Sequence, residues 1–201
     1  MSGGSVVSGD GPVGRLLAWR AEAERAGDPQ AGLMALCTTG PAGDPDARTV
    51  SVKLLPGGRI GFVTDRRSRK ARDIAARPRV AALFTWMSLR RQVTVRGEAA
   101  PIDAALAESI FLARPRPARL GAWASHQSAP IGGREVLDAA LAEAARRWPD
   151  GTAVPVPPHW AGYVIVPMEI EFVRAGRPDR LHDRHVDRLT GDVWTRQALS
   201  P

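Results

Sequence analysis

Hydrophobic and polar residues alternate along residues 50–53 (Val-Ser-Val-Lys), which is the period of a half-buried β-strand. A turn sequence, Pro-Gly-Gly at 56–58, separates this run from a second β-branched run at 60–65. Two such runs around a Pro-Gly-Gly turn predict a β-hairpin. The basic segment 66–72 has helical composition, so a helix is expected to begin close to Ser68.

The same patterns predict the other elements. Helices are expected over 13–26, 67–76, 101–113 and 132–148; strands over 31–39, 80–86, 92–99 and 163–172, and a closing hairpin over 185–196. The 31–39 run is interpreted as a buried strand, the strand at 163–172 is expected to break at Pro167, and 114–128 and 151–158 are interpreted as connections. Six or seven strands with interspersed helices predict a mainly β fold with peripheral helices, an antiparallel barrel.

The length of 201 residues suits one domain, which we expect over 13–201, preceded by a disordered Gly- and Ser-rich tail, 1–12. No apolar run approaches the roughly 18 residues of a membrane span. The N-terminus lacks the basic and apolar regions of a secretory signal. The single cysteine, Cys37, has no internal partner for a disulfide, so a cytoplasmic location is the expectation.

The charge of +7 and the pI of about 11 raise the question of nucleic-acid binding. The arginines are spread along the chain, no nucleic-acid module is recognisable, and one Tyr and four Phe offer few stacking surfaces beside the six Trp. Small anionic ligands such as phosphates are therefore the favoured partners, and nucleic acid and membrane are not expected.

A candidate anion site lies at the start of the helix predicted from residue 67. Cations there are unfavourable beside the positive end of the helix dipole, unless an anion binds among them. Arg69 and Lys70 occupy this position, and Thr64 at the preceding strand end offers a hydroxyl. A phosphate would resolve the conflict, and the alternative is a solvated basic helix end.

Other chemistry is sparse in the sequence. There is no His/Cys/Asp pattern with metal-ligand spacing and no Gly-x-Ser-x-Gly elbow, so no metal site is predicted. Arg180 and His182 lie two apart on a presumed strand and would share one face, although a lone histidine is more often structural. Arg48 and Lys53, five apart, would lie on opposite faces of a regular strand, so either a bulge intervenes or they touch different parts of a ligand.

Several motifs in order along the chain carry a family resemblance. They are residues 48–53, 63–64, 68–70, 91–93, 114–116, 120–128, 158–163 and 180–184. Together they resemble the pyridoxamine 5'-phosphate oxidase family over nearly the whole chain from about residue 13. The resemblance implies an FMN-binding split β-barrel that forms a homodimer.

The resemblance also implies roles for individual residues. Cofactor-binding residues would be Arg48, Thr49, Val50, Ser51, Val52, Lys53, Val63, Thr64, Ser68, Arg69, Lys70, Gln92, Gln127, Ser128, Val173 and Arg184. Substrate-binding residues would be Lys53, Ile110, Arg114, Ala118, Arg180 and His182, with Lys53, Arg180 and His182 catalytic. The family supplies the 48–70 set from one subunit and Gln92, Gln127, Ser128 and Arg184 from the other. From the residues alone, the preferred interpretation of Gln92 is a solvent-facing strand residue, and Gln127 and Ser128 are interpreted as ordinary loop and capping residues.

The chain departs from the family pattern on the substrate side. The family's oxidases hold the substrate phosphate with a Lys, a Tyr, an Arg and a Ser, where this chain has Lys53, Ile110, Arg114 and Ala118. Two lost hydroxyl donors to a charged group would weaken phosphate recognition by roughly two to four orders of magnitude if nothing replaces them. A tryptophan beside the flavin is replaced by Val173, and one residue is inserted before Arg180.

These observations lead to a functional expectation with two alternatives. We expect an FMN-dependent oxidase that oxidises an anionic amine, an alcohol or a reduced heterocyclic ring with dioxygen as acceptor, as phenazine-biosynthesis oxidases do in a specialised pathway. The first alternative is a genuine pyridoxine/pyridoxamine 5'-phosphate oxidase, which makes pyridoxal 5'-phosphate. The second is a flavin-binding protein without turnover.

Overall fold

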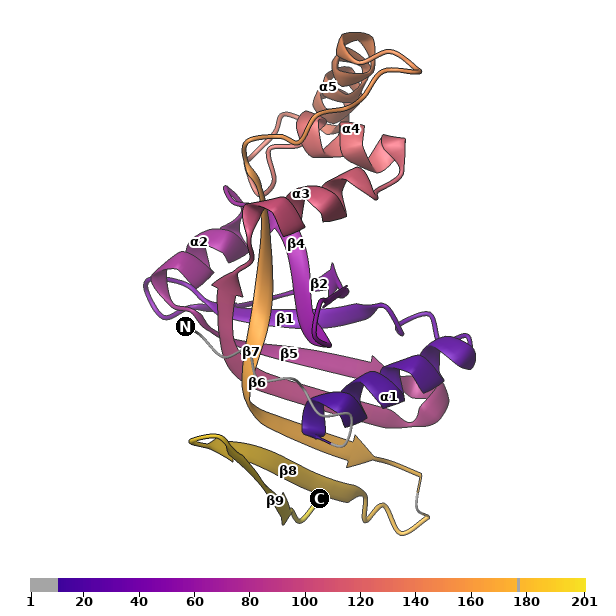
Figure 1. Ribbon diagram of the computed structural model, residues 1–201, viewed down its shortest axis with the longest axis vertical. Helices are drawn as coiled ribbons and strands as arrows, with labels where there is room; N and C mark the ends of the chain where they lie inside the picture. Colours follow the sequence, from indigo (N-terminus) through magenta and orange to yellow (C-terminus); the bar gives the residue numbers. More distant parts are fainter. Residues whose placement is uncertain (1–10, 177) are drawn as a thin grey trace.

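The computed structural model describes residues 11–176 and 178–201 (Figure 1). The helices are α1 Pro12–Arg25, α2 Arg69–Ala76, α3 Ala104–Leu112, α4 Arg116–Ala124, α5 Arg134–Arg147 and the 3₁₀ turn Met87–Leu89. The strands are β1 Leu33–Thr39, β2 Pro45–Ser51, β3 Lys53–Leu55, β4 Arg59–Asp65, β5 Arg79–Trp86, β6 Arg91–Pro101, β7 Trp160–Arg174, β8 Asp183–Thr190 and β9 Val193–Ala198. The mainly β fold with peripheral helices is confirmed.

The long strand β7 organises the sheet. One edge of β7 pairs antiparallel with β6 along most of its length. The other edge is shared: residues 160–165 pair with β4, and residues 169–174 pair with β8. The sheet therefore divides at β7. Its main path has the strand order β2-β1-β5-β6-β7-β4-β3, and β8 and β9 continue from the far half of β7. This division produces the split of the curled sheet.

The hydrophobic core lies inside the curl, and α1 packs against it (Figure 1). Trp86, Phe62, Phe84 and Phe172 are almost fully buried there. Trp19 of α1 meets the Phe172 ring edge-on with 5.2 Å between ring centroids, which fixes the helix on the sheet.

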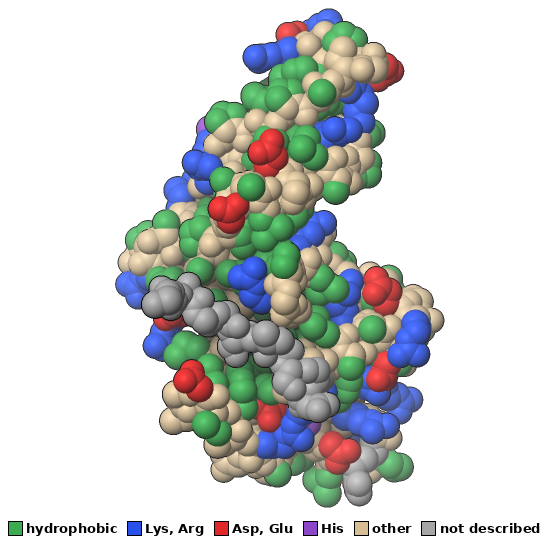
Figure 2. All heavy atoms as spheres, in the orientation of Figure 1, with side chains coloured by type: hydrophobic (Ala, Val, Ile, Leu, Met, Phe, Trp, Pro, Cys, Tyr) green, Lys and Arg blue, Asp and Glu red, His purple; other side chains and the backbone are tan. Residues whose placement is uncertain are grey.

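Helices α3, α4 and α5 form a separate lobe beyond one end of β7 (Figure 1). Its small core consists of Phe111, Leu120, Ala144 and Val154. Trp160, the first residue of β7, joins the lobe to the sheet, because its indole N–H donates to the Ala107 carbonyl at 2.9 Å. The space-filling view is indented between this lobe and the sheet (Figure 2).

Several predicted elements are confirmed. The turn at 56–58 joins β3 to β4, and Gly57 and Gly58 adopt the positive φ values (75° and 70°) that glycine tolerates best. Helix α2 begins after Ser68, whose hydroxyl accepts from the Ala71 N–H. The closing hairpin of β8 and β9 is also present.

Four expectations were wrong. The 31–39 run alternates between half-buried and buried residues instead of being buried throughout. The 114–128 connection contains α4, because Pro117 lies in the first turn of the helix, where proline is favoured. The described residues form nine strands instead of six or seven. Strand β7 does not break at Pro167, because a register shift between Arg96 and Gly97 of β6 accommodates the missing N–H.

The predicted tail covered residues 1–12, of which residues 1–10 lie outside the described residues, and the first helix already begins at Pro12. Among the helices of the described chain, none has the length and apolar character needed to cross a bilayer.

Candidate functional site

A cleft of about 800 Å³ lies between the sheet and the helical lobe, within the usual size range of small-molecule sites. Its walls come from β2 and β3, the end of β4, the start of α2, one face of α4 and residues 125–128. The predicted residues that line it are Arg48, Thr49, Val50, Ser51, Lys53, Val63, Thr64, Arg69, Lys70, Arg114, Ala118, Gln127 and Ser128. The fold therefore brings together residues from three distant parts of the sequence.

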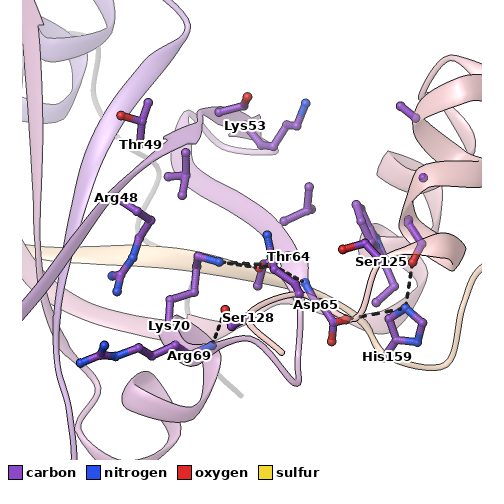
Figure 3. Close-up of a pocket in the computed structure, with 18 of the residues that line it drawn as sticks. Arg48, Thr49, Lys53, Thr64, Asp65, Arg69, Lys70, Ser125, Ser128 and His159 are labelled. Atoms are coloured by element: carbon purple, nitrogen blue, oxygen red, sulfur yellow. Dashed lines mark hydrogen bonds and ion pairs between the residues drawn. The ribbon is translucent and has the colours of Figure 1, made fainter. Parts of the chain in front are cut away.

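The start of α2 forms one end of the cleft (Figure 3). Lys70 is only 6% exposed, and its ammonium group donates to the Thr64 hydroxyl (3.3 Å) and to Gln127 Oε1 (3.2 Å). Within the described chain, no carboxylate lies within ion-pair distance of it. Burial, followed by the neighbouring charge of Arg48, lowers the pKa of Lys70. A buried cation without a carboxylate partner is the arrangement that binding of an anion stabilises.

The first backbone N–H of α2 is held by a hydroxyl. Arg69 N–H donates to Ser128 Oγ at 3.1 Å, and the Thr64 hydroxyl donates to Gln127 Oε1 at 2.7 Å. Gln127 and Ser128 thus lie beside the α2 start of their own chain. The expectation that these two residues reach the site from the partner subunit is not met in this structure, because the segment after α4 folds back over α2.

Asp46, to which the sequence assigned no role, binds two arginines beside this end of the cleft, Arg48 and Arg69. Arg48 forms an ion pair with Asp46 and donates to the Thr38 hydroxyl at 2.7 Å. Arg69 Nε lies 3.2 Å from Asp46 Oδ2. The spacing offered a signal, since Asp46 and Arg48 are two apart on β2 and share a face.

The strand is interrupted at Val52, and this interruption explains how Arg48 and Lys53, five residues apart, can line the same cleft. Strand β2 pairs with β1 up to Ser51, whereas β3 starts at Lys53 and pairs with β4. Between them Val52 is buried, and its N–H donates to the Gly32 carbonyl at 2.9 Å. Because the strand changes partner here, Arg48 and Lys53 both line the cleft, while Val52 does not.

Arg114 and one face of α4 form the other end of the cleft. The Arg114 guanidinium lies over the Trp160 ring, 4.7 Å from its centroid, and Nη1 is buried without a hydrogen-bond partner in the described chain. Burial lowers the pKa of Arg114. Of the two positions where a hydroxyl is missing, Ala118 lines the cleft, whereas Ile110 on α3 does not. Four small residues line this side, namely Ala118, Gly121, Ala122 and Ser125.

His159 and Asp65 line the cleft as well, and sequence analysis assigned them no role. His159 Nε2 lies 3.0 Å from the Ala122 carbonyl, which can only accept, so this nitrogen carries the proton. Asp65 accepts from Arg67 at 2.7 Å. Burial acts to raise the pKa of Asp65, but the hydrogen bonds from Arg67 and the nearby His159 outweigh it and lower the pKa. The motif at 158–163 was the available signal.

Ser68 is fully buried and supports the cleft without lining it. Its hydroxyl caps α2 through the Ala71 N–H and lies 3.3 Å from the Thr64 hydroxyl. Ser68 therefore shapes the anion end from behind.

The remaining predicted residues do not line the cleft of their own chain. Gln92, Val173 and Arg184 form one row across β6, β7 and β8, since Val173 is in register with both others. Arg180 and His182 lie in the connection before β8, so the presumed strand was wrong there, and Arg180 has a positive φ of 60°. His182 Nδ1 is buried without a hydrogen-bond partner in the described chain.

The residues present fit a phosphate-bearing cofactor such as FMN. The charge of Lys70, which has no carboxylate partner among the described residues, and the start of α2 suit a phosphate, and the cleft leaves further volume between that end and Arg114. Arg114, which also lines the cleft, provides a second cation for an anionic group away from α2.

Comparisons with known proteins agree with this geometry. Residues 21–147 match the family described as "Pyridoxamine 5'-phosphate oxidase", and residues 160–201 match "Pyridoxine 5'-phosphate oxidase C-terminal dimerisation region", which supports the predicted homodimer. A pyridoxine/pyridoxamine 5'-phosphate oxidase of Anaeromyxobacter dehalogenans is 45% identical over 94% of this chain and 95% of its own length. One of Azorhizobium caulinodans is 43% identical over 100% and 95%.

This chain is also similar to a solved structure. The chain is similar to PhzG from Burkholderia lata, solved in complex with tetrahydrophenazine-1-carboxylic acid, with a TM-score of 0.88, 30% identity, and coverage of 94% of this chain and 92% of that one. The matches cover the sheet, the cleft and the C-terminal hairpin together, and the chain belongs to the pyridoxamine 5'-phosphate oxidase family.

Proposed function

We propose that this chain is a homodimeric FMN-dependent oxidoreductase that oxidises a small anionic substrate bound at the Arg114 end of the cleft, with dioxygen as the final acceptor. The observation that carries the proposal is a single cleft lined by two separate cations, the buried Lys70 of α2 and Arg114 just before α4. One end holds the cofactor phosphate, and the other remains for the substrate.

When bound, FMN supplies the ring that accepts a hydride and passes electrons on. The protein's own groups bind and orient. Lys70, Thr64 and the start of α2 hold the phosphate, while Asp46 keeps Arg48 and Arg69 directed at it. Arg114, stacked on Trp160, holds the anionic group of the substrate. Lys53, on the β3 side of the cleft, faces both ligands.

The second row of residues completes the site from the partner subunit. Gln92, Val173 and Arg184 lie outside the cleft of their own chain yet form one continuous row. In this proposal, two-fold symmetry places that row against the partner's flavin, while Arg180 and His182 reach its substrate.

The substrate class that the cleft favours is a flat ring carrying a carboxylate. Ala118, Gly121 and Ala122 make the α4 side small and mostly apolar, with Arg114 as the cation beside it. The 30% identical PhzG was solved with a ring carboxylic acid, which supports this choice. The second candidate is pyridoxine or pyridoxamine 5'-phosphate, which the 45% identity to an oxidase of that name favours.

Anaerobic reduction of the bound flavin by a panel of compounds tests the proposal. A reduced tricyclic carboxylic acid, pyridoxine 5'-phosphate and pyridoxamine 5'-phosphate would each be mixed with the oxidised protein, and loss of flavin absorbance recorded. Faster reduction by the carboxylic acid supports the first candidate, and faster reduction by the vitamin phosphates supports the second. If no compound in a broad panel reduced the flavin, the protein would be a flavin binder without turnover.

A further inference from the structure

The β7 residues Glu169, Glu171 and Val173 share one face of their strand, because side chains alternate along it. The opposite face carries Ile170 and Phe172, both fully buried in the core. Glu171 nevertheless is only 7% exposed, which is unusual for a carboxylate outside the core. Its surroundings must therefore compensate its charge.

The compensation comes mainly from Arg184, whose guanidinium is held at two points. Arg184 Nε donates to Glu171 Oε1 at 2.8 Å, and Nη1 donates to the Ser200 carbonyl at 3.3 Å. In the described chain, Nη2 has no hydrogen-bond partner. The side chain is 36% exposed, so Nη2 is left available to a group outside this chain.

Glu171 is also tied to β6. Arg96 Nη1 lies 3.3 Å from Glu171 Oε2 and 2.7 Å from Glu169 Oε1. Burial acts to raise the pKa of Glu171, but hydrogen bonds from Arg184 and Arg96 outweigh it and lower the pKa. Glu171 is thus a fixed negative charge between two strands.

We propose that Glu171 is a positioning residue for the flavin site: its carboxylate fixes the Arg184 guanidinium so that Nη2 points to the flavin in the partner's cleft. The inference rests on the proposed function, in which Arg184 reaches that flavin across the dimer. A flexible arginine loses rotamer freedom when it binds, and a carboxylate that restricts it in advance reduces this loss.

The neighbouring Glu169 provides a matched control. It lies two residues away on the same face and also binds Arg96, but its other partner is Arg188 at 2.7 Å instead of Arg184. Glu171→Gln and Glu169→Gln therefore remove the same charge from the same face, and only the first releases Arg184.

The test is titration of flavin-free protein with FMN, followed by flavin fluorescence. We expect Glu171→Gln to raise the dissociation constant roughly ten-fold and Glu169→Gln to leave it unchanged within about two-fold. In an Arg184→Ala background, Glu171→Gln should have no further effect, because the residue it positions is gone. The melting temperature of the flavin-free variants reports whether folding is intact.

The outcomes separate this inference from the function on which it rests. Equal weakening by Glu171→Gln and Glu169→Gln, or the same loss with and without Arg184, would overturn the positioning role alone. If Arg184→Ala bound FMN as tightly as the unchanged protein, the assignment of Arg184 to the flavin would fail as well. If Glu171→Gln proved poorly folded, Glu171→Asp keeps the charge with a shorter reach, and unchanged affinity in that folded variant would also contradict the inference.

Discussion

Lys70 is the residue at which stability and function oppose each other most directly. Its ammonium group is buried with two neutral oxygen partners and, among the residues that the structure describes, no carboxylate. We expect Lys70→Met to weaken FMN binding by roughly 10- to 150-fold, the value of a charge-assisted hydrogen bond of about 1.5 to 3 kcal/mol. Fluorescence titration of the flavin-free protein measures this change. Arg66→Gln is the control, since Arg66 is outside the cleft and has no acidic partner in the described chain.

Lys70→Met should also raise the free energy of unfolding of the flavin-free protein, by an amount that depends on pH. The pKa of Lys70 is lowered in the folded state, so between that pKa and the ordinary value of 10.5 the unfolded chain binds more protons. The free energy of unfolding of the protein that carries Lys70 therefore rises with pH in this window. Urea unfolding should show Lys70→Met more stable than the unchanged protein at neutral pH, with the difference shrinking toward pH 10.5. A constant difference across that range would contradict the burial argument.

The substrate end allows a gain-of-function prediction. Ala118→Ser adds a hydroxyl on a residue that lines the cleft, whereas Ile110→Tyr must reach it from α3. We expect the double variant to accelerate flavin reduction by pyridoxine 5'-phosphate, with Ala118→Ser alone giving most of the gain, because each donor to a phosphate stabilises binding by about 1.5 to 3 kcal/mol. Stopped-flow reduction at several substrate concentrations measures it. Efficient wild-type turnover of this compound with no gain in the variants would show that other groups already replace the hydroxyls.

At the scale of elements, the start of α2 is fixed by a local residue, the capping Ser68. Ser68→Ala removes the hydrogen bond to the Ala71 N–H, and we expect a loss of about 1 kcal/mol and a melting temperature lowered by about 2–4 °C. FMN affinity should fall several-fold, because the proposed site places the cofactor phosphate at the first turn of α2. Asp103→Ala removes the corresponding cap of α3 and should lower the melting temperature similarly without weakening FMN binding. Equal effects on FMN from both variants would contradict a local role for Ser68.

The elements also show what sequence patterns can and cannot predict. The hairpin of β3 and β4 and the start of α2 were predictable, because turn glycines and a serine cap are local signals. Helix α4 was missed because residues 114–128 were interpreted as a connection, although Pro117 suits the first turn of a helix. The continuity of β7 past Pro167 depends on a compensating shift at Gly97, a residue 70 positions away. The contacts of Asp46 with Arg69 and of His159 with Ala122 likewise join residues that only the fold brings near, although Arg48, two residues from Asp46, was a local signal.

At the scale of the whole molecule, a single chain accounts for one part of the predicted flavin site and leaves the other part displaced. The cleft residues gather around α2, while the row of Gln92, Val173 and Arg184 lies outside the cleft on the β6–β8 sheet. The matched dimerisation region, 160–201, contains β7 and β8, which carry two of the three residues in that row. We therefore expect an obligate homodimer whose sites are shared between subunits, and sedimentation showing a monomer that still binds FMN tightly would contradict it.

Sites shared between subunits lead to a further prediction. Two variants that are each defective in FMN binding should form mixed dimers in which one site binds FMN with native affinity. Lys70→Met damages the cleft, and Arg184→Ala damages the row, so a mixed dimer carries one site with both defects and one intact site. If subunits exchange freely from an equal mixture, half of the dimers are mixed and about a quarter of all sites regain native FMN affinity. Titration after refolding the two variants together, compared with each refolded alone, measures the recovery. No recovery in mixed dimers verified by distinct affinity tags would mean that each chain builds its flavin site from its own residues.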